Sequence, residues 1–263
     1  MSDDLQVAIV AARAAGELLR AEFVHVHRVV HKGVIDLVTE MDRAAEARIV
    51  EILRTATPDY GFLTEESAAV AGAGNARWIV DPLDGTTNYA HGCPHFCVSI
   101  ALERDGGLCL GVIYDPLRDE LFAARRGAGA TLNGKPIRVG ATASLGSALV
   151  STGFPYDAWT NPHNNSDEVA HFLRRVQALR CTGSAGLDLA AVACGRSDAH
   201  WERGLAPYDV AAGILLVREA GGRVTDYGGG PDALYGGEIL AANPAVHAAM
   251  LEYLRGRHEL RGG

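Results

Sequence analysis

The sequence predicts a mixed α/β (α+β) fold built from two halves. Apolar residues recur at helical spacing over residues 4–54, which predicts helices at the N-terminus. From about residue 97 to residue 139 the apolar period becomes that of strands, with turn signals between the segments. After about residue 145, helical and strand-like segments alternate, which is typical of a layered α/β arrangement.

Two helices are expected before the first strand. The first is predicted over residues 4–24, with an apolar face made of Ala8, Ala11, Ala12, Ala15, Leu18 and Leu19. The second is predicted over residues 39–54, with Thr39 as its candidate N-cap and Pro58 just past its end. Its core stripe consists of Ala45, Ile49, Ile52 and Leu53.

Strands dominate the rest of the first half. Residues 78–80 predict a short buried strand that ends at Asp81, and Thr86 follows a glycine turn as a possible helix start. An antiparallel meander is then expected, with strands at residues 97–104, 108–114 and 119–124. Asn133-Gly134 is a strong hairpin signal that ends this series.

The second half alternates helices with strands, and a division into halves 1–144 and 145–263 is expected. Strands are predicted at residues 148–151, 198–202 and 237–240, and helices at residues 166–179, 184–194, 208–219 and 244–255. The glycine-rich residues 227–237 are expected to form surface turns. Acidic residues from both halves predict a site at their junction.

Composition is typical of a globular enzyme. The chain has 263 residues, of which 48% are hydrophobic, enough for a large core. Its five cysteines have no disulfide-framework or CxxC spacing, so we expect a reducing compartment, the cytoplasm. No apolar run is long enough to span a membrane. The net charge of −8 argues against nucleic acid as a partner.

The stretch WIVDPLDGTTNY, residues 78–89, is the most informative segment for function. Asp81 and Asp84 follow an apolar run, three positions apart, and lead into Gly85. Paired carboxylates are typical cation ligands, and the backbone N–H groups at a helix start favour phosphate. Together they indicate phosphoryl chemistry on a divalent ion, which needs charge neutralisation and alignment.

Further ligands are expected from two other segments. GFLTEES places Glu65 after an apolar run, and Asp209 stands at the start of a largely apolar helix. Carboxylates about 4 Å apart repel by about 4 kcal/mol at an effective dielectric of 20, so such a cluster requires a cation. All-oxygen ligands suit Mg²⁺, with Mn²⁺ as a possible substitute.

The chain resembles the inositol monophosphatase family over nearly its whole length. DPLDGTTNYAHGCPHFCVSIAL and WERGLAPYDVAAGILLVREAGG resemble the two family signatures, with TEES and DLVTEMD upstream of them. The resemblance implies a layered αβαβα sandwich, a homodimer, sensitivity to lithium, and two or three Mg²⁺ ions per site. The implied metal ligands are Glu65, Asp81, the carbonyl of Leu83, Asp84 and Asp209.

The resemblance also implies roles for the other site residues. Thr86, held by Asp42, would orient an attacking water on the metal, so that Glu65, Thr86 and Asp42 carry catalysis. The implied substrate contacts are Gly85, Thr86, Gly183, Ser184, Ala185, Glu202 and Asp209. Thr64, Tyr208 and Ala206 depart from the family pattern and bear on substrate preference.

Simpler interpretations exist for several of these residues. Asp209 suits a helix N-cap, Asp42 the first turn of the helix at 39–54, and Glu66 a surface acid or a support for Glu65. In HGCPHFC, the donors His91, Cys93, His95 and Cys97 would share one face of a strand. Zinc is nevertheless disfavoured there, since donors on one strand splay along a line and Pro94 interrupts it.

The predicted function is Mg²⁺-dependent hydrolysis of myo-inositol monophosphate, a small polyol phosphate. A fructose-1,6-bisphosphatase, a histidinol-phosphatase or a nucleotide-bisphosphate phosphatase would use the same metal core. Thr87-Asn88 favours the inositol branch within the resembled group. A haloacid-dehalogenase-like phosphatase is disfavoured because its aspartates are two positions apart. A regulatory binding protein with residual phosphatase activity is the alternative from another class.

Overall fold

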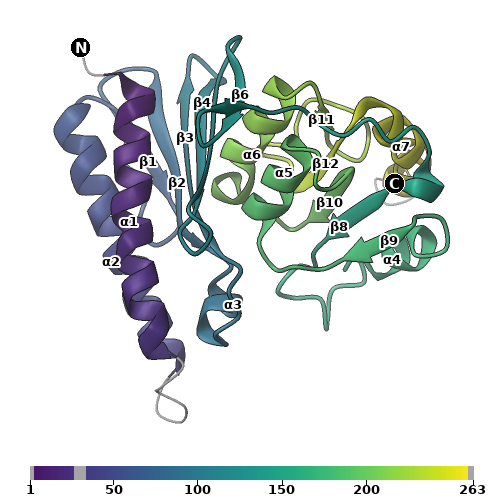
Figure 1. Ribbon diagram of the computed structural model, residues 1–263, viewed down its shortest axis with the longest axis horizontal. Coiled ribbons are helices and arrows are strands. Elements are labelled where there is room, and N and C mark those ends of the chain that lie inside the picture. The colour runs from purple at the N-terminus through teal and green to yellow at the C-terminus, as the bar shows by residue number, and fades with distance from the viewer. Residues whose placement is uncertain (1–2, 27–33, 260–263) are drawn as a thin grey trace.

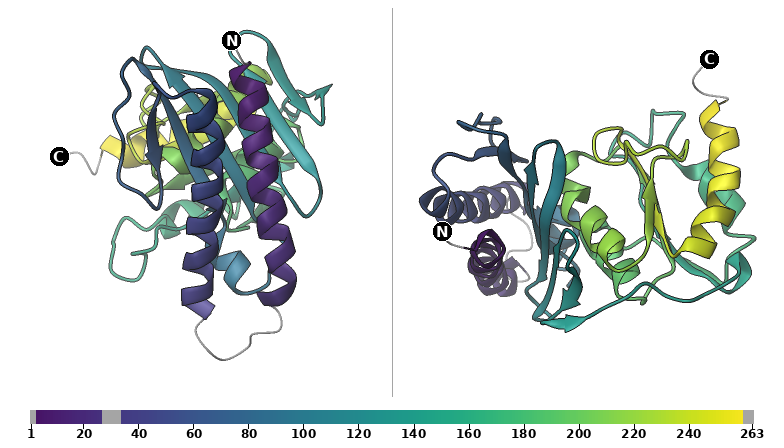
Figure 2. Two further views of the ribbon diagram at one scale, coloured as in Figure 1. Left: turned by 90° about the vertical axis from the view of Figure 1, so that its left-hand side faces the viewer. Right: turned by 90° about the horizontal axis from the view of Figure 1, so that it is seen from above.

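Two long helices cover one face of a seven-stranded sheet. They are α1 (Asp4–Val26) and α2 (Val34–Ala56), which lie side by side in the computed structural model (Figure 1; Figure 2). The structure describes residues 3–26 and 34–259. The buried face of α1 bears small side chains, including Ala8, Ala11 and Ala15. Small side chains let a helix lie close to its neighbours.

The seven strands follow one another in sheet order as in sequence. They are β1 (Gly61–Thr64), β2 (Ala76–Asp84), β3 (Cys97–Arg104), β4 (Gly107–Asp115), β5 (Glu120–Arg125), β6 (Gly129–Leu132) and β7 (Lys135–Pro136). β1 runs parallel to β2 and the remaining pairs are antiparallel. The β2–β3 register shifts between Asp81 and Asp84, where the five-residue helix α3 (Thr86–Ala90) is about to begin. A register shift at a strand end redirects side chains, which makes this the natural place for a site.

The second sheet has five strands in the order β11-β12-β10-β8-β9. Its strands are β8 (Leu149–Thr152), β9 (Ala178–Arg180), β10 (Ala199–Arg203), β11 (Arg223–Thr225) and β12 (Glu238–Ala242). The remaining helices are α4 (Ser166–Phe172), α5 (Ala185–Ala193), α6 (Pro207–Glu219) and α7 (Pro244–Glu259), with a short 3₁₀ turn at Leu145–Ser147.

The layers alternate as helix, sheet, helix, sheet, helix. α5 and α6 lie between the two sheets, and α7 covers the far face of the second sheet (Figure 2). Among the described residues, three apolar cores join the five layers, and the core around α5 and α6 reaches both sheets. Trp78 belongs to the core under α1 and α2, Leu189 to the core around α5 and α6, and Trp201 to the core under α7. The αβαβα sandwich implied by the resemblance is therefore confirmed.

Several predicted elements match closely and others need correction. β3 has the predicted bounds, and Asn133-Gly134 forms a tight turn with φ of 49° and 76°. Thr39 is not an N-cap, because the described part of α2 already begins at Val34. The helix predicted over residues 166–179 is wrong beyond Phe172, since residues 178–180 form β9, whose Leu179 pairs with Val150. A local apolar run could not distinguish that edge strand from a helical face.

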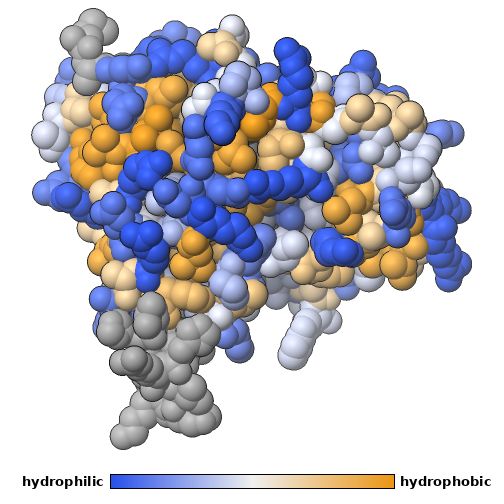
Figure 3. All heavy atoms as spheres, viewed as in Figure 1, coloured by the Kyte–Doolittle hydropathy of each residue, from blue (hydrophilic) through white to orange (hydrophobic). Residues whose placement is uncertain are grey.

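The molecular surface mixes polar and apolar side chains, with an apolar gathering over α1 and α2 (Figure 3). Val10 of α1 is 48% exposed. Within residues 3–26 and 34–259, no helix combines the length and the apolar character that crossing a membrane requires.

Candidate active site

The signature aspartates lie where β2 leaves the sheet. Asp81 and Asp84 are buried, and Asp81 Oδ1 accepts a hydrogen bond from the Leu83 amide at 3.0 Å. The Leu83 carbonyl in turn accepts one from Thr86 Oγ1 at 3.0 Å. These local bonds stabilise the turn after the apolar strand and keep both carboxylates on the same side of it.

Asp81 lies among other acids. Burial, followed by the charges of Glu65 and Asp84, raises its pKa well above the ordinary value. Glu65 follows β1, the parallel neighbour of β2, and forms a hydrogen bond with Asp81. Crowding by surrounding atoms raises the pKa of Glu65 to about 7 despite that bond, although its side chain keeps contact with solvent. Two carboxyls that share a hydrogen bond must share a proton or a cation.

Asp209 joins this cluster from the second half of the chain. It is the third residue of α6, and its Oδ2 accepts a hydrogen bond from the Ala206 amide at 2.6 Å. Burial, with the charges of Asp84 and Glu65, raises its pKa to about 8 although the Ala206 bond opposes the shift. The hydrogen bond from the Ala206 amide is a capping contact, as the simpler interpretation expects. The charges of Asp84 and Glu65 show that Asp209 also belongs to the acid cluster.

Asp84 connects the two halves directly. Its Oδ2 accepts hydrogen bonds from the Gly186 amide at 2.8 Å and from Ser184 Oγ, both at the start of α5. The Cys97 thiol lies 3.4 Å from the same oxygen. One carboxylate thus ties the first signature to a segment 100 positions further along the chain.

Asp42 lies beneath the cluster, in the interior of α2 and not in its first turn, so the helix-dipole interpretation is wrong. Its side chain is 3% exposed, and its Oδ1 has no hydrogen-bond partner. Burial and the charges of Glu65 and Glu66 raise its pKa to about 7, while its contact with Thr86 opposes the shift. Glu66 itself points to the surface, where it pairs with Arg43 at 3.6 Å.

The donor chemistry of the cluster suits a divalent cation. Desolvation by surrounding protein atoms raises the pKa values of Glu65, Asp81, Asp84 and Asp209, and the charges of neighbouring carboxylates add to the shift in each case. As the side chains stand, no three His, Cys, Asp or Glu residues in the described chain form a ready ion-binding group. Asp84 Oδ2 and Asp209 Oδ2 accept hydrogen bonds from the Gly186 and Ala206 amides, which orients the two carboxylates.

A cavity of about 290 Å³ opens beside the acids. Of the predicted site residues, its walls contain Asp84, Gly85, Gly183, Ser184, Ala185, Glu202 and Asp209. Glu65, Asp81, Leu83, Thr86 and Asp42 are not among its lining residues. A larger hollow of about 870 Å³ near Gly61 and Gly106 is shallow and distant from the cluster. The smaller cavity is the better candidate for a substrate.

Gly85 and Asn88 fix the junction between the halves. Gly85 has φ of 97°, and an added Cβ would lie 3.0 Å from the His95 carbonyl. Asn88 Nδ2 donates to the carbonyls of His95 and Thr182, both at 2.8 Å. Sequence reasoning used Asn88 only as a branch marker and missed this bridging role, because Thr182 is 94 residues away.

Aromatic and polar side chains that the sequence did not single out complete the cavity. They are Phe154, Tyr156, Cys181 and Arg203, joined by the apolar Leu205 and by Thr87, which served above only as a branch marker. Desolvation by nearby protein atoms and the charges of Glu65 and Asp209 raise the pKa of Tyr156 to about 12, so it stays a hydroxyl donor. Tyr156 is 96% exposed by surface area, so its link to the cluster is electrostatic and not one of packing.

The donors of HGCPHFC do not form a common face. β3 begins only at Cys97, which is buried, whereas Cys93 is exposed. The shared strand that a zinc site would need is therefore not present at His91–His95. All five cysteines carry free thiols.

Alternating layers with a cavity of acids at their junction define this protein as a layered α/β phosphatase. The family model for the inositol monophosphatase family matches residues 1–259. Inositol-1-monophosphatase of Rhizobium meliloti is 46% identical over 254 residues, covering 95% of this chain and 96% of that protein. The structure of inositol monophosphatase from Anabaena (Nostoc) sp. PCC 7120 superposes with a TM-score of 0.87 at 45% identity, covering 96% of this chain and 95% of the other. The chain belongs to the inositol monophosphatase family.

A protein of another description is almost as similar. The Nus factor SuhB of Escherichia coli is 44% identical over 254 residues, covering 95% of each chain. The resemblance to the inositol monophosphatase family is confirmed. The similar proteins include both inositol-1-monophosphatases and Nus factors.

Proposed function

We propose that this protein hydrolyses the phosphomonoester bond of myo-inositol monophosphate with the help of Mg²⁺. Membership in the inositol monophosphatase family supports phosphatase activity on an inositol phosphate. The observation that carries the proposal is the meeting of four acids from distant parts of the chain beside a cavity. Clustered carboxylates repel one another, and a bound cation relieves this repulsion. The cluster is therefore expected to bind a cation.

Proteins of this family are generally metal-dependent, and Mg²⁺ is the ion that we propose, two or three per site, with Mn²⁺ as a substitute. The ligands would be Glu65, Asp81, the Leu83 carbonyl, Asp84 and Asp209, all oxygen donors. Bound divalent ions would neutralise the phosphate charge and make water more acidic.

The chain's own groups would position the reactants. The Thr86 hydroxyl, supported by Asp42, would hold the attacking water, and Glu65 would hold it near the phosphorus. The backbone amides of Gly85 and Thr86 would donate to the phosphate. The oxygen of water forms the new P–O bond, the ester P–O bond breaks, and the proton passes to the departing inositol oxygen.

The opposite wall of the cavity would recognise the polyol. Glu202 and the segment Gly183-Ser184-Ala185 line it and offer acceptors and donors for hydroxyl groups. Tyr208 and Ala206, which depart from the family pattern, flank Asp209 and would tune which polyol fits. This substrate is small, as is usual in the family.

The test is a panel of phosphate esters assayed with and without Mg²⁺. We expect kcat/KM for inositol 1-phosphate to exceed that for fructose 1,6-bisphosphate and adenosine 3′,5′-bisphosphate, since specificity is a difference in transition-state binding. A preference for either bisphosphate would assign the site to a neighbouring sugar or nucleotide phosphatase. Hydrolysis that does not depend on a divalent ion would overturn the proposal.

A regulatory role is the second candidate, because a relative at 44% identity is a Nus factor. Affinity capture from cell extract with a metal-ligand variant would detect partners independently of catalysis. A transcription protein retained by wild type and by the inactive variant would support this role.

We also propose a cytoplasmic homodimer that lithium inhibits. The five free thiols support a reducing compartment. The exposed aromatic side chains Phe154 and Trp159, at 43% and 100%, support an interface between copies. Sedimentation analysis checks the dimer, and assay with LiCl checks inhibition.

A further inference from the structure

A buried histidine lies directly behind the proposed polyol-binding acid. His200 and Glu202 are two residues apart on β10, so their side chains share one face of the sheet. That face looks toward α5, while Trp201 between them packs into the core under α7. His200 is 0% exposed, so it cannot touch a substrate and acts only through its neighbours.

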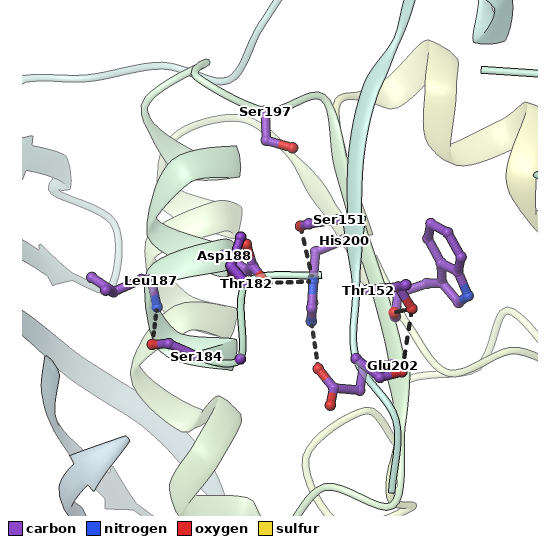
Figure 4. A network of polar contacts seen from close by, with 12 residues as sticks. Ser151, Thr152, Thr182, Ser184, Leu187, Asp188, Ser197, His200 and Glu202 are labelled. Atoms are coloured by element: carbon purple, nitrogen blue, oxygen red, sulfur yellow. Dashed lines mark hydrogen bonds and ion pairs between the residues drawn. The ribbon is translucent and has the colours of Figure 1, made fainter. Parts of the chain in front are cut away.

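His200 contacts a carboxylate at each end of its ring (Figure 4). Nε2 lies 3.3 Å from Glu202 Oε2, and Nδ1 lies 3.6 Å from Asp188 Oδ2 on α5. Nδ1 is also 3.1 Å from Ser151 Oγ, on the neighbouring strand of the sheet. Nε2 makes no well-aligned hydrogen bond, so it meets Glu202 in a close ring–carboxylate contact, which is an ion pair when the imidazole is protonated.

The surroundings favour a charged imidazole. Burial lowers the pKa of His200, but the contact with Glu202 and the charges of Asp188 and Glu202 outweigh it and raise the pKa above its ordinary value. Asp188 is fixed in turn, because its Oδ2 accepts a hydrogen bond from Thr182 Oγ1 at 2.8 Å. The imidazole is therefore held in place between Asp188 and Glu202, and the two acids favour its protonated form.

Gly153 confines the same carboxylate from another side. A Cβ at Gly153 would lie 2.1 Å from Glu202 Oε1 and 2.6 Å from Oε2. The Gly153 backbone cannot yield easily, because its carbonyl accepts a hydrogen bond from Asn165 Nδ2 at 2.8 Å. The His200 imidazole confines the Glu202 carboxylate on one side, and the Gly153 backbone confines it on another. Glu202 also lines the cavity.

We propose that His200 is a positioning residue that holds Glu202 in the orientation needed to accept hydrogen bonds from the hydroxyls of a polyol phosphate. This inference rests on the proposed function and assigns its selectivity to a residue outside the cavity. His200, Asp188 and Gly153 together preorganise one carboxylate, so that hydroxyl recognition costs little side-chain entropy. The class of substrate that benefits has a hydroxyl near the phosphate-bearing carbon.

The test compares two amide replacements of His200. In His200→Asn the amide stays near the place of Nδ1 and cannot reach Glu202. In His200→Gln the amide nitrogen reaches the place of Nε2 and can donate to Glu202. Substrates are inositol 1-phosphate and p-nitrophenyl phosphate, which has no hydroxyl for Glu202. His247→Asn is the matched control, because His247 is a buried histidine on α7 that contacts Thr225 and is absent from the cavity walls.

We expect His200→Asn to lower the ratio of kcat/KM for inositol 1-phosphate over p-nitrophenyl phosphate about 10-fold, mainly through KM, because Glu202 loses the ring contact that orients it. His200→Gln should recover most of the ratio, and His247→Asn should keep it. Glu202→Gln should lower the ratio similarly, and the His200→Asn/Glu202→Gln double variant should add little to either single change. Gly153→Ala, which displaces the carboxylate from the other side, should give the same loss.

Equal losses for both substrates, an unchanged ratio in His200→Asn, or multiplying effects in the double variant would overturn the inference. If His200→Asn does not fold, Gly153→Ala and the nuclear magnetic resonance of the ring decide. In wild type labelled with ¹⁵N-histidine, the His200 ring signals should shift on Glu202→Gln, and unshifted signals would contradict the contact. Wild type that hydrolyses neither ester would refute the proposed function, while the ring signals would still test the contact.

Discussion

Two groups of acids near the cavity differ in the groups that surround them. Asp188 and Glu202 share the imidazole of His200, at 3.6 and 3.3 Å. Among the described residues, the hydrogen bonds and charges around Asp81, Asp84 and Asp209 come from amides, a hydroxyl, a thiol and other acids. The first group contains the His200 imidazole, and the second has no basic group among these described partners. From this difference we infer that the first group has a structural role and that the second binds a cation.

The largest expected effect comes from removing one acid of the second group. Asp81→Asn should lower kcat/KM for inositol 1-phosphate by more than about 1,000-fold, since even partners behind metal ligands are worth about 10- to 100-fold. Steady-state assay at saturating Mg²⁺ measures it. Asp105→Asn, on an exposed turn after β3, is the matched control and should keep wild-type activity. Full activity in Asp81→Asn would remove Asp81 from the ligand set.

The next largest effect is expected from removing the imidazole of the first group. His200→Phe leaves Asp188, which is 6% exposed, without its cationic partner, and should destabilise the fold by about 3 kcal/mol. Chemical denaturation measures the free energy of unfolding. Adding Asp188→Asn should restore much of that loss, and the loss should be the same with and without Mg²⁺. A loss that Mg²⁺ reverses would mean that the two groups are not distinct.

A smaller effect concerns pH and metal-free stability. Asp209 and Glu65 have pKa values raised to about 8 and about 7, above the ordinary 3.8 and 4.5. The folded state then holds protons that the unfolded state releases, so this stabilisation is complete below about pH 4 and is lost as pH rises through about 8. Chelator-treated protein should melt at a lower temperature at pH 8 than at pH 6, and Mg²⁺ should remove most of that difference. A melting temperature that rises over this interval without metal would contradict the assignment.

The smallest effect should come from the bridge between the halves. Asn88→Ala removes the amide that joins α3 to the Thr182 carbonyl and should cost about 1 kcal/mol of stability. Because Thr182 also supports Asp188, the KM for inositol 1-phosphate should rise as well. Calorimetry and steady-state kinetics measure the two effects. Unchanged stability and KM would show that the halves are joined by other contacts alone.

Local patterns predicted much of this architecture. The pattern of apolar residues predicts the bounds of β3 correctly. The two aspartates of the first signature mark the turn where the acids meet. The end of α4 was predicted wrongly, because β9 is an edge strand whose pairing with β8 is not visible in the local period. Long-range contacts were missed for a related reason. The bond between Asp84 and Gly186 spans 102 positions, and nothing near either residue encodes it.

His200 is an instructive omission. The strand predicted over residues 198–202 already places His200 and Glu202 on one face, and this spacing was the available signal. Asp188 on the facing helix and Gly153 at the end of the adjacent strand complete the arrangement only in three dimensions.

The most direct test of the contrast between the two groups is metal binding by chelator-treated protein. Titration with Mn²⁺, followed by electron paramagnetic resonance, should give at least two ions per chain for wild type and for His200→Gln, and fewer for Asp81→Asn. Hydrolysis of inositol 1-phosphate should be absent without metal and return in parallel with binding. Undiminished hydrolysis by the stripped protein, or equal binding by Asp81→Asn, would contradict the account.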